Sequence, residues 1–66
     1  MQDLGLNIRI ARIRRRETLW SLGKKVNILP ARLSEIERGQ RIPTPEVLEK
    51  ICGVLEVNVV EIQGNQ

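Results

Sequence analysis

The sequence contains no histidine, phenylalanine or tyrosine, and it has a single cysteine, Cys52, and a single tryptophan, Trp20. Without histidine, neither a Ser/His/Asp nor a Cys/His catalytic arrangement is available, and a zinc site is disfavoured for the same reason. One cysteine forms no disulfide within the chain. No uninterrupted apolar run reaches the roughly 18 residues that cross a membrane. We therefore expect a cytoplasmic protein that is not an enzyme and uses no metal, cofactor or membrane.

The apolar content is almost entirely aliphatic, with eight leucines, eight isoleucines and six valines in 66 residues. This is enough for the core of one small domain spanning residues 1–66, although a chain of this size buries only about 60% of its unfolded surface. The hydrophobic fraction of 41% is too high for a disordered tail. We expect a single folded domain that is too small to carry a substrate cleft of its own.

The charges are unevenly distributed along the chain, whose formal net charge is +3. Residues 1–45 carry ten basic and four acidic side chains, whereas residues 46–66 carry one basic and four acidic side chains. A basic part of this kind attracts polyanions, which is typical of a domain that docks one face on nucleic acid. An ordinary solvated surface has the same composition, so charge alone does not separate the two interpretations.

Capping and breaking residues divide the chain into five short segments. In the first, the apolar residues fit both a helical stripe and the alternation of a strand, so periodicity leaves its structure open. Thr18 is a good N-cap for the second, Pro30 suits the first helical position of the third, and Gly39 suits its C-terminal end. Thr44 and Asn58 cap the fourth and the fifth. The segments span about residues 3–15, 18–26, 29–39, 45–55 and 59–62.

A fixed series of residues runs from the second segment to the loop after the third: Leu22-Gly23, Val26, Ile28, Leu33, Ile36-Glu37-Arg38-Gly39 and Pro43. It extends outward through Leu4-Gly5, Ile8, Arg12, Leu48, Ile51, Leu55-Glu56-Val57-Asn58 and Ile62. This pattern resembles the phage-repressor/Cro-like (xenobiotic-response-element) helix-turn-helix family over almost the whole chain. The resemblance implies an all-α, five-helix, lambda-repressor-like DNA-binding domain with its helix-turn-helix at about residues 18–38, and a helical first segment.

In this family the first helix of the motif lies across the DNA backbone and the second enters the major groove, which assigns these roles to residues 18–26 and 29–38. We expect phosphate contacts from Thr18, Leu19, Arg12, Lys24, Lys25, Arg38, Gln40 and Arg41. The resemblance also implies a structural ion pair between Arg12 and Glu37, which would hold the first helix against the third. The alternative is two ordinary surface charges.

The start of the recognition helix departs from the family, which often carries polar residues there. Pro30 and Ala31 offer no side-chain hydrogen bond, although either can touch a thymine methyl group. Base readout then falls on Arg32, Ser34 and Glu35. Arg32 can bind guanine in a bidentate way, and Glu35 can accept from cytosine N4 or merely repel a phosphate.

The second segment departs as well, because Leu19 and Trp20 follow its cap where a polar residue is common. We expect Trp20 to lie against the first helix and to compensate for a core without phenylalanine. The alternative is an exposed patch of Leu19, Trp20, Ile10 and Ile13 that binds a protein partner. Gly23 permits the close contact between the second and third helices, and Cys52 is read as a small core residue.

The sequence thus predicts a sequence-specific regulator that binds double-stranded DNA, most simply a repressor that occupies an operator. Family members commonly dimerise, and Val57, Val59 and Val60 are the residues that we expect at the contact of a homodimer. The alternative function is a protein–protein interaction module that keeps the helix-turn-helix scaffold and has lost base readout. Salt dependence separates the two, because phosphate binding weakens steeply with salt and an apolar contact does not.

Overall fold

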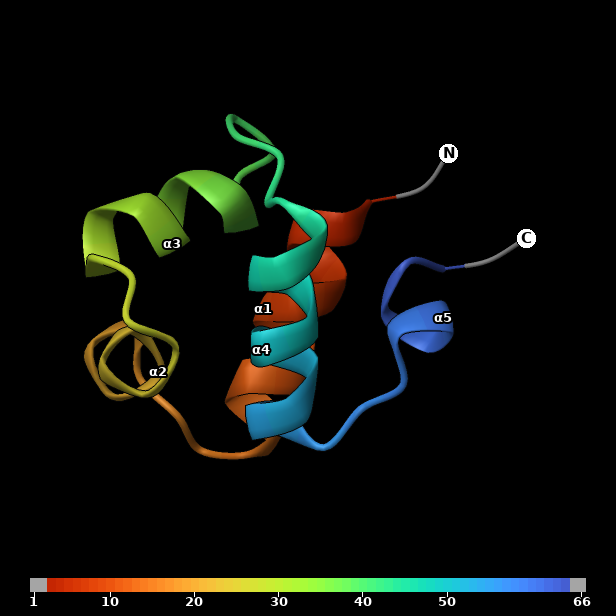
Figure 1. Cartoon of the computed structure of the whole chain (residues 1–66), viewed down its shortest axis with the longest axis horizontal. Coiled ribbons are helices and arrows are strands. Elements are labelled where there is room, and N and C mark those ends of the chain that lie inside the picture. The colour runs from red at the N-terminus through yellow and green to blue at the C-terminus, as the bar shows by residue number, and fades with distance from the viewer. Residues whose placement is uncertain (1–2, 65–66) are drawn as a thin grey trace.

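The computed structural model describes residues 3–64, and this part of the chain folds into five α-helices without a strand (Figure 1). The helices are α1 (Leu4–Arg14), α2 (Leu19–Val26), α3 (Pro30–Glu37), α4 (Pro45–Leu55) and α5 (Val59–Ile62). The all-α prediction is confirmed, and the first segment, whose periodicity was ambiguous, is a helix. No helix within these residues is long and apolar enough to cross a membrane.

The helix ends lie where the capping residues indicate. Thr18 and Ser21 form a capping box, in which each side chain accepts a hydrogen bond from the other residue's backbone N–H. Thr44 caps α4 by accepting from the Val47 N–H at 3.2 Å. Asn58 caps α5 in the same manner. These side chains satisfy N–H groups that a helix leaves without partners at its start.

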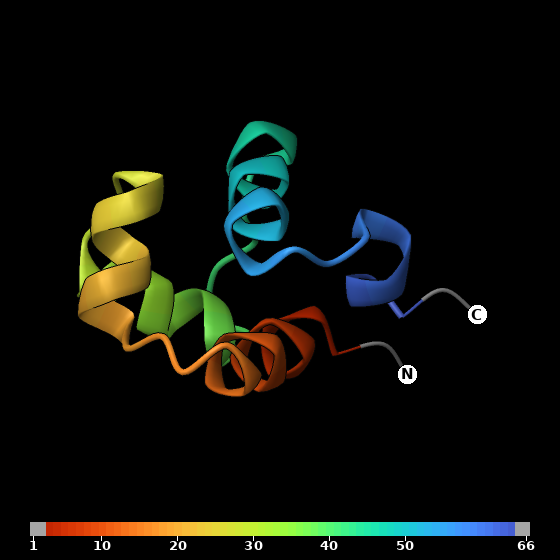
Figure 2. The same cartoon turned by 90° about the horizontal axis from the view of Figure 1, so that it is seen from below.

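The core is built from one face of each helix. Eleven buried apolar side chains form it: Ile8, Ala11, Leu22, Val26, Leu33, Ile36, Leu48, Ile51, Cys52, Leu55 and Ile62. In Figures 1 and 2, α1 and α4 occupy the middle of the molecule, α2 and α3 lie at one end of the long axis, and α5 lies at the other. The helix-turn-helix is therefore at the end farthest from both described chain ends.

Two glycines allow the backbones of different helices to approach each other. A Cβ atom on Gly23 would collide with the carbonyl oxygen of Ile28, so the predicted close contact at the turn between α2 and α3 is present. A Cβ atom on Gly5 would collide with the carbonyl oxygens of Ile36 and Glu37 at the end of α3. The second contact fixes α1 against α3, and the sequence alone did not distinguish Gly5 from an ordinary helix glycine.

The prediction that Trp20 lies against the first helix is wrong, because its side chain is 72% exposed. On a helix with about 100° between residues, Leu22 and Val26 share one face with Leu19, and Trp20 lies opposite that face. Leu22 and Val26 are 0% and 2% exposed, and Leu19 packs against the same core. Aliphatic side chains thus fill the interior without the indole.

Candidate nucleic-acid interface

The N-terminal half of α3 is the part of the helix-turn-helix that faces away from the core. Leu33 and Ile36 point inward, while Ala31 and Arg32 are exposed and Leu29 is 68% exposed. Leu29 provides no side-chain cap, so the N–H groups of Ala31 and Arg32 have no hydrogen-bond partner within the described chain. This end of α3 therefore presents free donors, one unpaired guanidinium and an apolar surface.

Glu35 is held by the loop that follows α3. Its Oε1 accepts a hydrogen bond from Arg41 Nε at 2.9 Å, and both side chains remain partly exposed. This hydrogen bond, together with the positive charge of Arg41, lowers the pKa of Glu35 below its ordinary value. The pairing neutralises the only acidic side chain on the outer part of α3. Arg41 is likewise engaged, and Arg32 has no ion-pair partner among residues 3–64.

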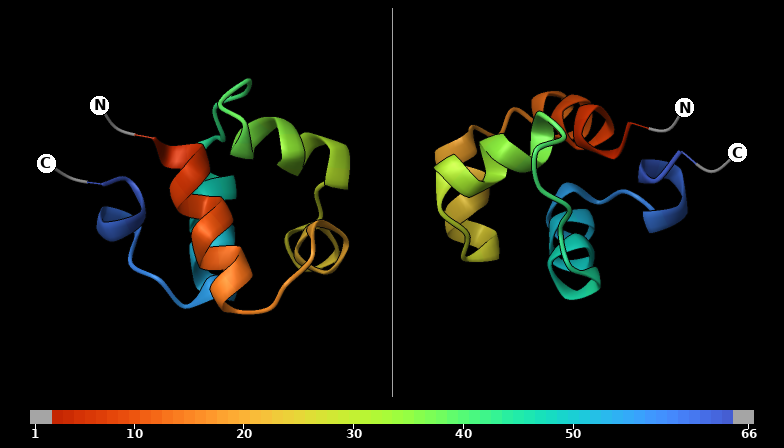
Figure 3. Two further views of the ribbon diagram at one scale, coloured as in Figure 1. Left: turned by 180° about the vertical axis from the view of Figure 1, so that it is seen from behind. Right: turned by 90° about the horizontal axis from the view of Figure 1, so that it is seen from above.

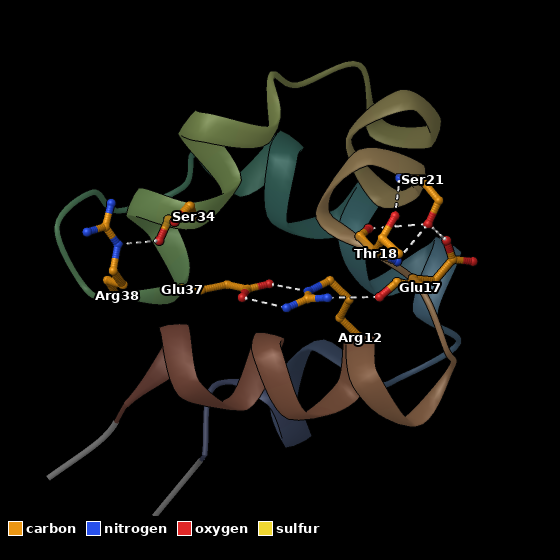
Figure 4. A network of polar contacts seen from close by, with 7 residues as sticks. All are labelled: Arg12, Glu17, Thr18, Ser21, Ser34, Glu37 and Arg38. Carbon is orange, nitrogen blue, oxygen red and sulfur yellow. Dashed lines mark hydrogen bonds and ion pairs between the residues drawn. The ribbon is translucent and has the colours of Figure 1, made fainter.

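The expected ion pair of Arg12 and Glu37 is present and joins α1 to α3 (Figure 4). Arg12 Nε and Nη2 donate to the two carboxylate oxygens at 2.7 and 3.1 Å, and Nη1 donates to the backbone carbonyl of Glu17 at 2.8 Å. The side chains are only 13% and 6% exposed. With three donors committed inside the domain, the main role of Arg12 is structural.

Glu17 belongs to the same network, and sequence reasoning missed it. Its carboxylate accepts from the Lys25 ammonium at 2.6 Å and from the Ser21 hydroxyl. The hydrogen bond from Lys25, followed by that from Ser21, lowers the pKa of Glu17. Glu17, directly before the Thr18 cap, thus connects the start of α2 to its last turn through Lys25. The feature of the sequence that could have identified it is an acidic residue directly before an N-cap.

The expected phosphate-binding residues differ in how free their side chains are. Lys25 and Arg41 are paired with glutamates, and Arg38 Nε donates weakly to the Ser34 carbonyl at 3.4 Å. Lys24 and Gln40 are exposed, and neither side chain has a hydrogen-bond partner in the described chain. The capping box uses the N–H groups of Thr18 and Ser21, so those of Leu19 and Trp20 are left without a hydrogen-bond partner in the described chain.

The residues predicted at a dimer contact, and those of the alternative partner patch, differ in their exposure. Val57 and Val59 pack against the core, whereas Val60 is 58% exposed. In the alternative patch of Leu19, Trp20, Ile10 and Ile13, the prediction is wrong for Leu19, which packs against the core, whereas Trp20, Ile10 and Ile13 are 72%, 41% and 54% exposed. The side chain that accompanies Ile10 and Ile13 on α1 is Leu6, which is 45% exposed.

Within residues 3–64, no three acidic or cysteine side chains come together as metal ligands. Cys52 is buried in the core, which fits the prediction for this residue, and burial raises the pKa of its thiol. The described site therefore consists of donors, cations and apolar side chains on α2, α3 and the following loop. Such a surface binds and orients a polyanion.

A helix-turn-helix family model matches residues 8–62 of the chain. No curated protein sequence matches it significantly. Among solved structures, the chain is similar to the clp gene regulator ClgR from Corynebacterium glutamicum, with a TM-score of 0.88 and 32% identity over 91% of this chain. The chain spans 64% of the length of that ClgR chain, slightly less than two thirds.

Two further similarities concern proteins solved with DNA. SinR, the master regulator for biofilm formation, was solved in complex with DNA and has a TM-score of 0.83 and 32% identity, covering 89% of this chain and 95% of the SinR chain. The P22 c2 repressor in complex with a synthetic operator has a TM-score of 0.90 over the whole of both chains. Its identity of 24% makes this a likeness of fold alone.

Proposed function

Because the chain belongs to the helix-turn-helix family of phage-repressor and Cro-like (xenobiotic-response-element) regulators, we propose that it is a cytoplasmic, sequence-specific DNA-binding regulator that represses transcription by occupying an operator. The observation that carries the proposal is the uncovered N-terminal half of α3, with the unpaired Arg32 and two free N–H groups at the end of the molecule remote from α5. A major groove about 12 Å wide admits a helix presented in this way.

Base readout in this proposal combines one polar contact with an apolar surface. Arg32 donates to guanine O6 and N7, a bidentate contact worth about 1–3 kcal/mol of discrimination. Pro30 and Ala31 contact thymine methyl groups, because they carry no side-chain donor or acceptor. Ser34 and Glu35 lie farther along the helix, and Glu35 can accept from cytosine N4 through Oε2, which Arg41 does not use.

Phosphate binding surrounds the recognition helix. Lys24 is free for it, the Leu19 N–H and the Thr18 hydroxyl lie at the start of α2, and Gln40 is exposed on the loop after α3. Further proposed contacts come from cations that already have internal partners: Arg12, Lys25, Arg38 and Arg41. Each of these cations contacts its internal partner and a phosphate at the same time. Because the side chain is already held, binding costs less conformational entropy than ordering a flexible side chain would.

We propose a homodimer for operator binding, with its two-fold axis beside α5. Val60 is the exposed apolar residue of that helix, and the neighbouring Val57 and Val59 are partly buried against the core. Since α3 and α5 lie at opposite ends of the molecule in Figure 1, such an axis places the two recognition helices on the outer parts of the dimer. Half-sites about 34 Å apart lie on one face of the duplex.

The test is selection from a randomised duplex library at about 150 mM salt, near physiological ionic strength, followed by sequencing. We expect an enriched palindrome with half-sites one helical turn apart. An enriched single half-site would contradict the dimer but not DNA binding. No enrichment by the folded protein would favour the interaction-module function instead. Arg32→Ala is the matched variant, and it should relax discrimination at particular base pairs and leave the fold unchanged.

A further inference from the structure

The outer face of α1 carries an apolar stripe. Leu6, Ile10 and Ile13 are 45%, 41% and 54% exposed, and their spacing of four and three residues places them in one narrow arc. At about 100° per residue, this arc lies opposite to Ile8 and Ala11, which face the core. In Figure 3 (left) the outer side of α1 faces the viewer with no other helix across it, and Figure 2 shows the same side open.

Cations flank the stripe on both sides. Arg9 and Arg14 are exposed, and neither makes an ion pair or hydrogen bond within residues 3–64. The helix itself contains no acidic residue. Arg15 behaves differently, because it pairs with Glu56 at 3.2 Å. The stripe is therefore bordered by two cations that have no ion-pair partner among the described residues.

A groove adjoins the stripe at Ile10. It has a volume of about 630 Å³ and lies between α1 and the segment that joins α4 to α5, with Val57 and Ile62 among its lining residues. Asn7 closes one side by donating to the Ile62 carbonyl at 2.8 Å. Arg14, Glu56 and Glu61 also line it, so the stripe is continuous with a depression that has both apolar and charged side chains.

The charges decide which occupant fits this face. A second copy packed α1 against α1 would set the uncompensated cations of the two chains close to each other, and like charges repel. A DNA backbone would pair with Arg9 and Arg14 but would leave three apolar side chains against a charged surface. An acidic amphipathic helix satisfies both features, because its apolar residues cover the stripe and its carboxylates meet the two arginines.

We propose that the outer face of α1 docks an amphipathic, acidic helix of a partner protein, with apolar anchors on Leu6, Ile10 and Ile13 and carboxylates on Arg9 and Arg14. The face is distinct from the exposed half of α3. One helix face is a small interface, and we expect a transient complex of micromolar affinity.

The experiment is selection by the full chain from a displayed library of helical peptides, in which the apolar face is fixed and the flanking positions are randomised among Glu, Gln and Lys. We expect enrichment of Glu at the flanks. Binding of an enriched peptide should weaken about tenfold or more in the double variant Ile10→Gln/Ile13→Gln, since exposed apolar anchors carry most of the affinity. Arg9→Ala/Arg14→Ala should weaken binding more at low salt than at high salt.

Ile42→Gln is the matched control, because Ile42 is the most exposed isoleucine at 87% and lies in the loop between α3 and α4. It should leave peptide binding unchanged. The proposal is overturned by enrichment of Lys or Gln at the flanks, by no enrichment, or by binding that survives Ile10→Gln/Ile13→Gln. Self-association that this double variant abolishes would assign the face to a second copy instead. Thermal melting shows whether the variants are folded.

Discussion

Replacing Glu37 with leucine would remove one partner of the ion pair between α1 and α3 and leave the Arg12 guanidinium uncompensated. Arg12 is 13% exposed, and the two hydrogen bonds to Glu37 at 2.7 and 3.1 Å disappear together. Breaking a buried pair from one side costs about 3–5 kcal/mol. A domain of this length has a total stability of about 3–10 kcal/mol at typical values per residue. The variant should therefore be close to unfolding.

Replacing both partners separates the cost of a stranded charge from the worth of the pair. Arg12→Met combined with Glu37→Leu keeps an apolar contact between the helices, and it strands no charge. The double variant leaves the Glu17 carbonyl without its hydrogen bond from Arg12. This loss costs about 1–3 kcal/mol if the carbonyl stays buried. We expect the free energy of unfolding of the double variant to exceed, by several kcal/mol, the value obtained by adding the losses of the two single variants.

Urea denaturation followed by helical circular dichroism measures each free energy of unfolding. Glu56→Gln is the control, because it breaks the exposed pair with Arg15 and should change the stability by less than about 1 kcal/mol. High salt should reduce the effect of the control more than that of the buried pair. Single changes at Arg12 and Glu37 that cost under about 1 kcal/mol, or that add within about 0.5 kcal/mol, would refute a buried, coupled pair.

Other substitutions test individual contacts. Iodide should readily quench Trp20 in the folded protein, because its indole is 72% exposed; protection from iodide would contradict that exposure. Gly5→Ala should destabilise the protein by about 1–3 kcal/mol in urea, because its methyl group meets the backbone of α3. Gly53→Ala should stabilise the protein by about 0.5–1 kcal/mol, because a Cβ at this position has nothing within 4 Å. If both glycine substitutions changed the stability in the same direction, the packing argument would be refuted. The pKa of Glu17 is lowered in the folded protein, so its contribution to the free energy of unfolding is full at neutral pH and is lost as the pH falls below 4.5. The difference in stability between wild type and Glu17→Gln should therefore shrink in acid.

Much of the fold follows from local chemistry that is visible in the sequence. Thr18, Thr44 and Asn58 are capping residues, and each begins a helix at the expected place. Gly39 has a φ of 78° just after α3, as its expected place at that helix end requires. The helical structure of α1 does not follow from local chemistry in this way, because its apolar residues face both the core and the solvent. Only the family resemblance predicted it, since the exposed stripe gives the segment a misleading alternation.

The errors in the candidate site have a common physical origin. Trp20 was assigned to the interior because large aromatic side chains usually contribute to a core, yet Leu19, Leu22 and Val26 already fill the inner face of α2. The pairing of Glu35 with Arg41 depends on how the loop after α3 folds back, and no spacing rule predicts that. Periodicity assigns residues to faces, whereas the partners of exposed charges depend on tertiary geometry.

The composition of the α3 surface bears on the proposed homodimer. One bidentate arginine contributes about 1–3 kcal/mol of discrimination, and Arg32 is the only side chain on the outer half of α3 that is free to make such a contact. Ala31 and Pro30 add only methyl contacts. Specific regulators need about 4–10 kcal/mol over non-specific DNA, because a genome offers about a million or more competing sites. A single domain with one free arginine falls short of this range, whereas two half-sites double the discrimination to about 2–6 kcal/mol and so reach its lower part. This deficit supports the proposed homodimer, and it is larger here because the N-terminal end of α3 is apolar.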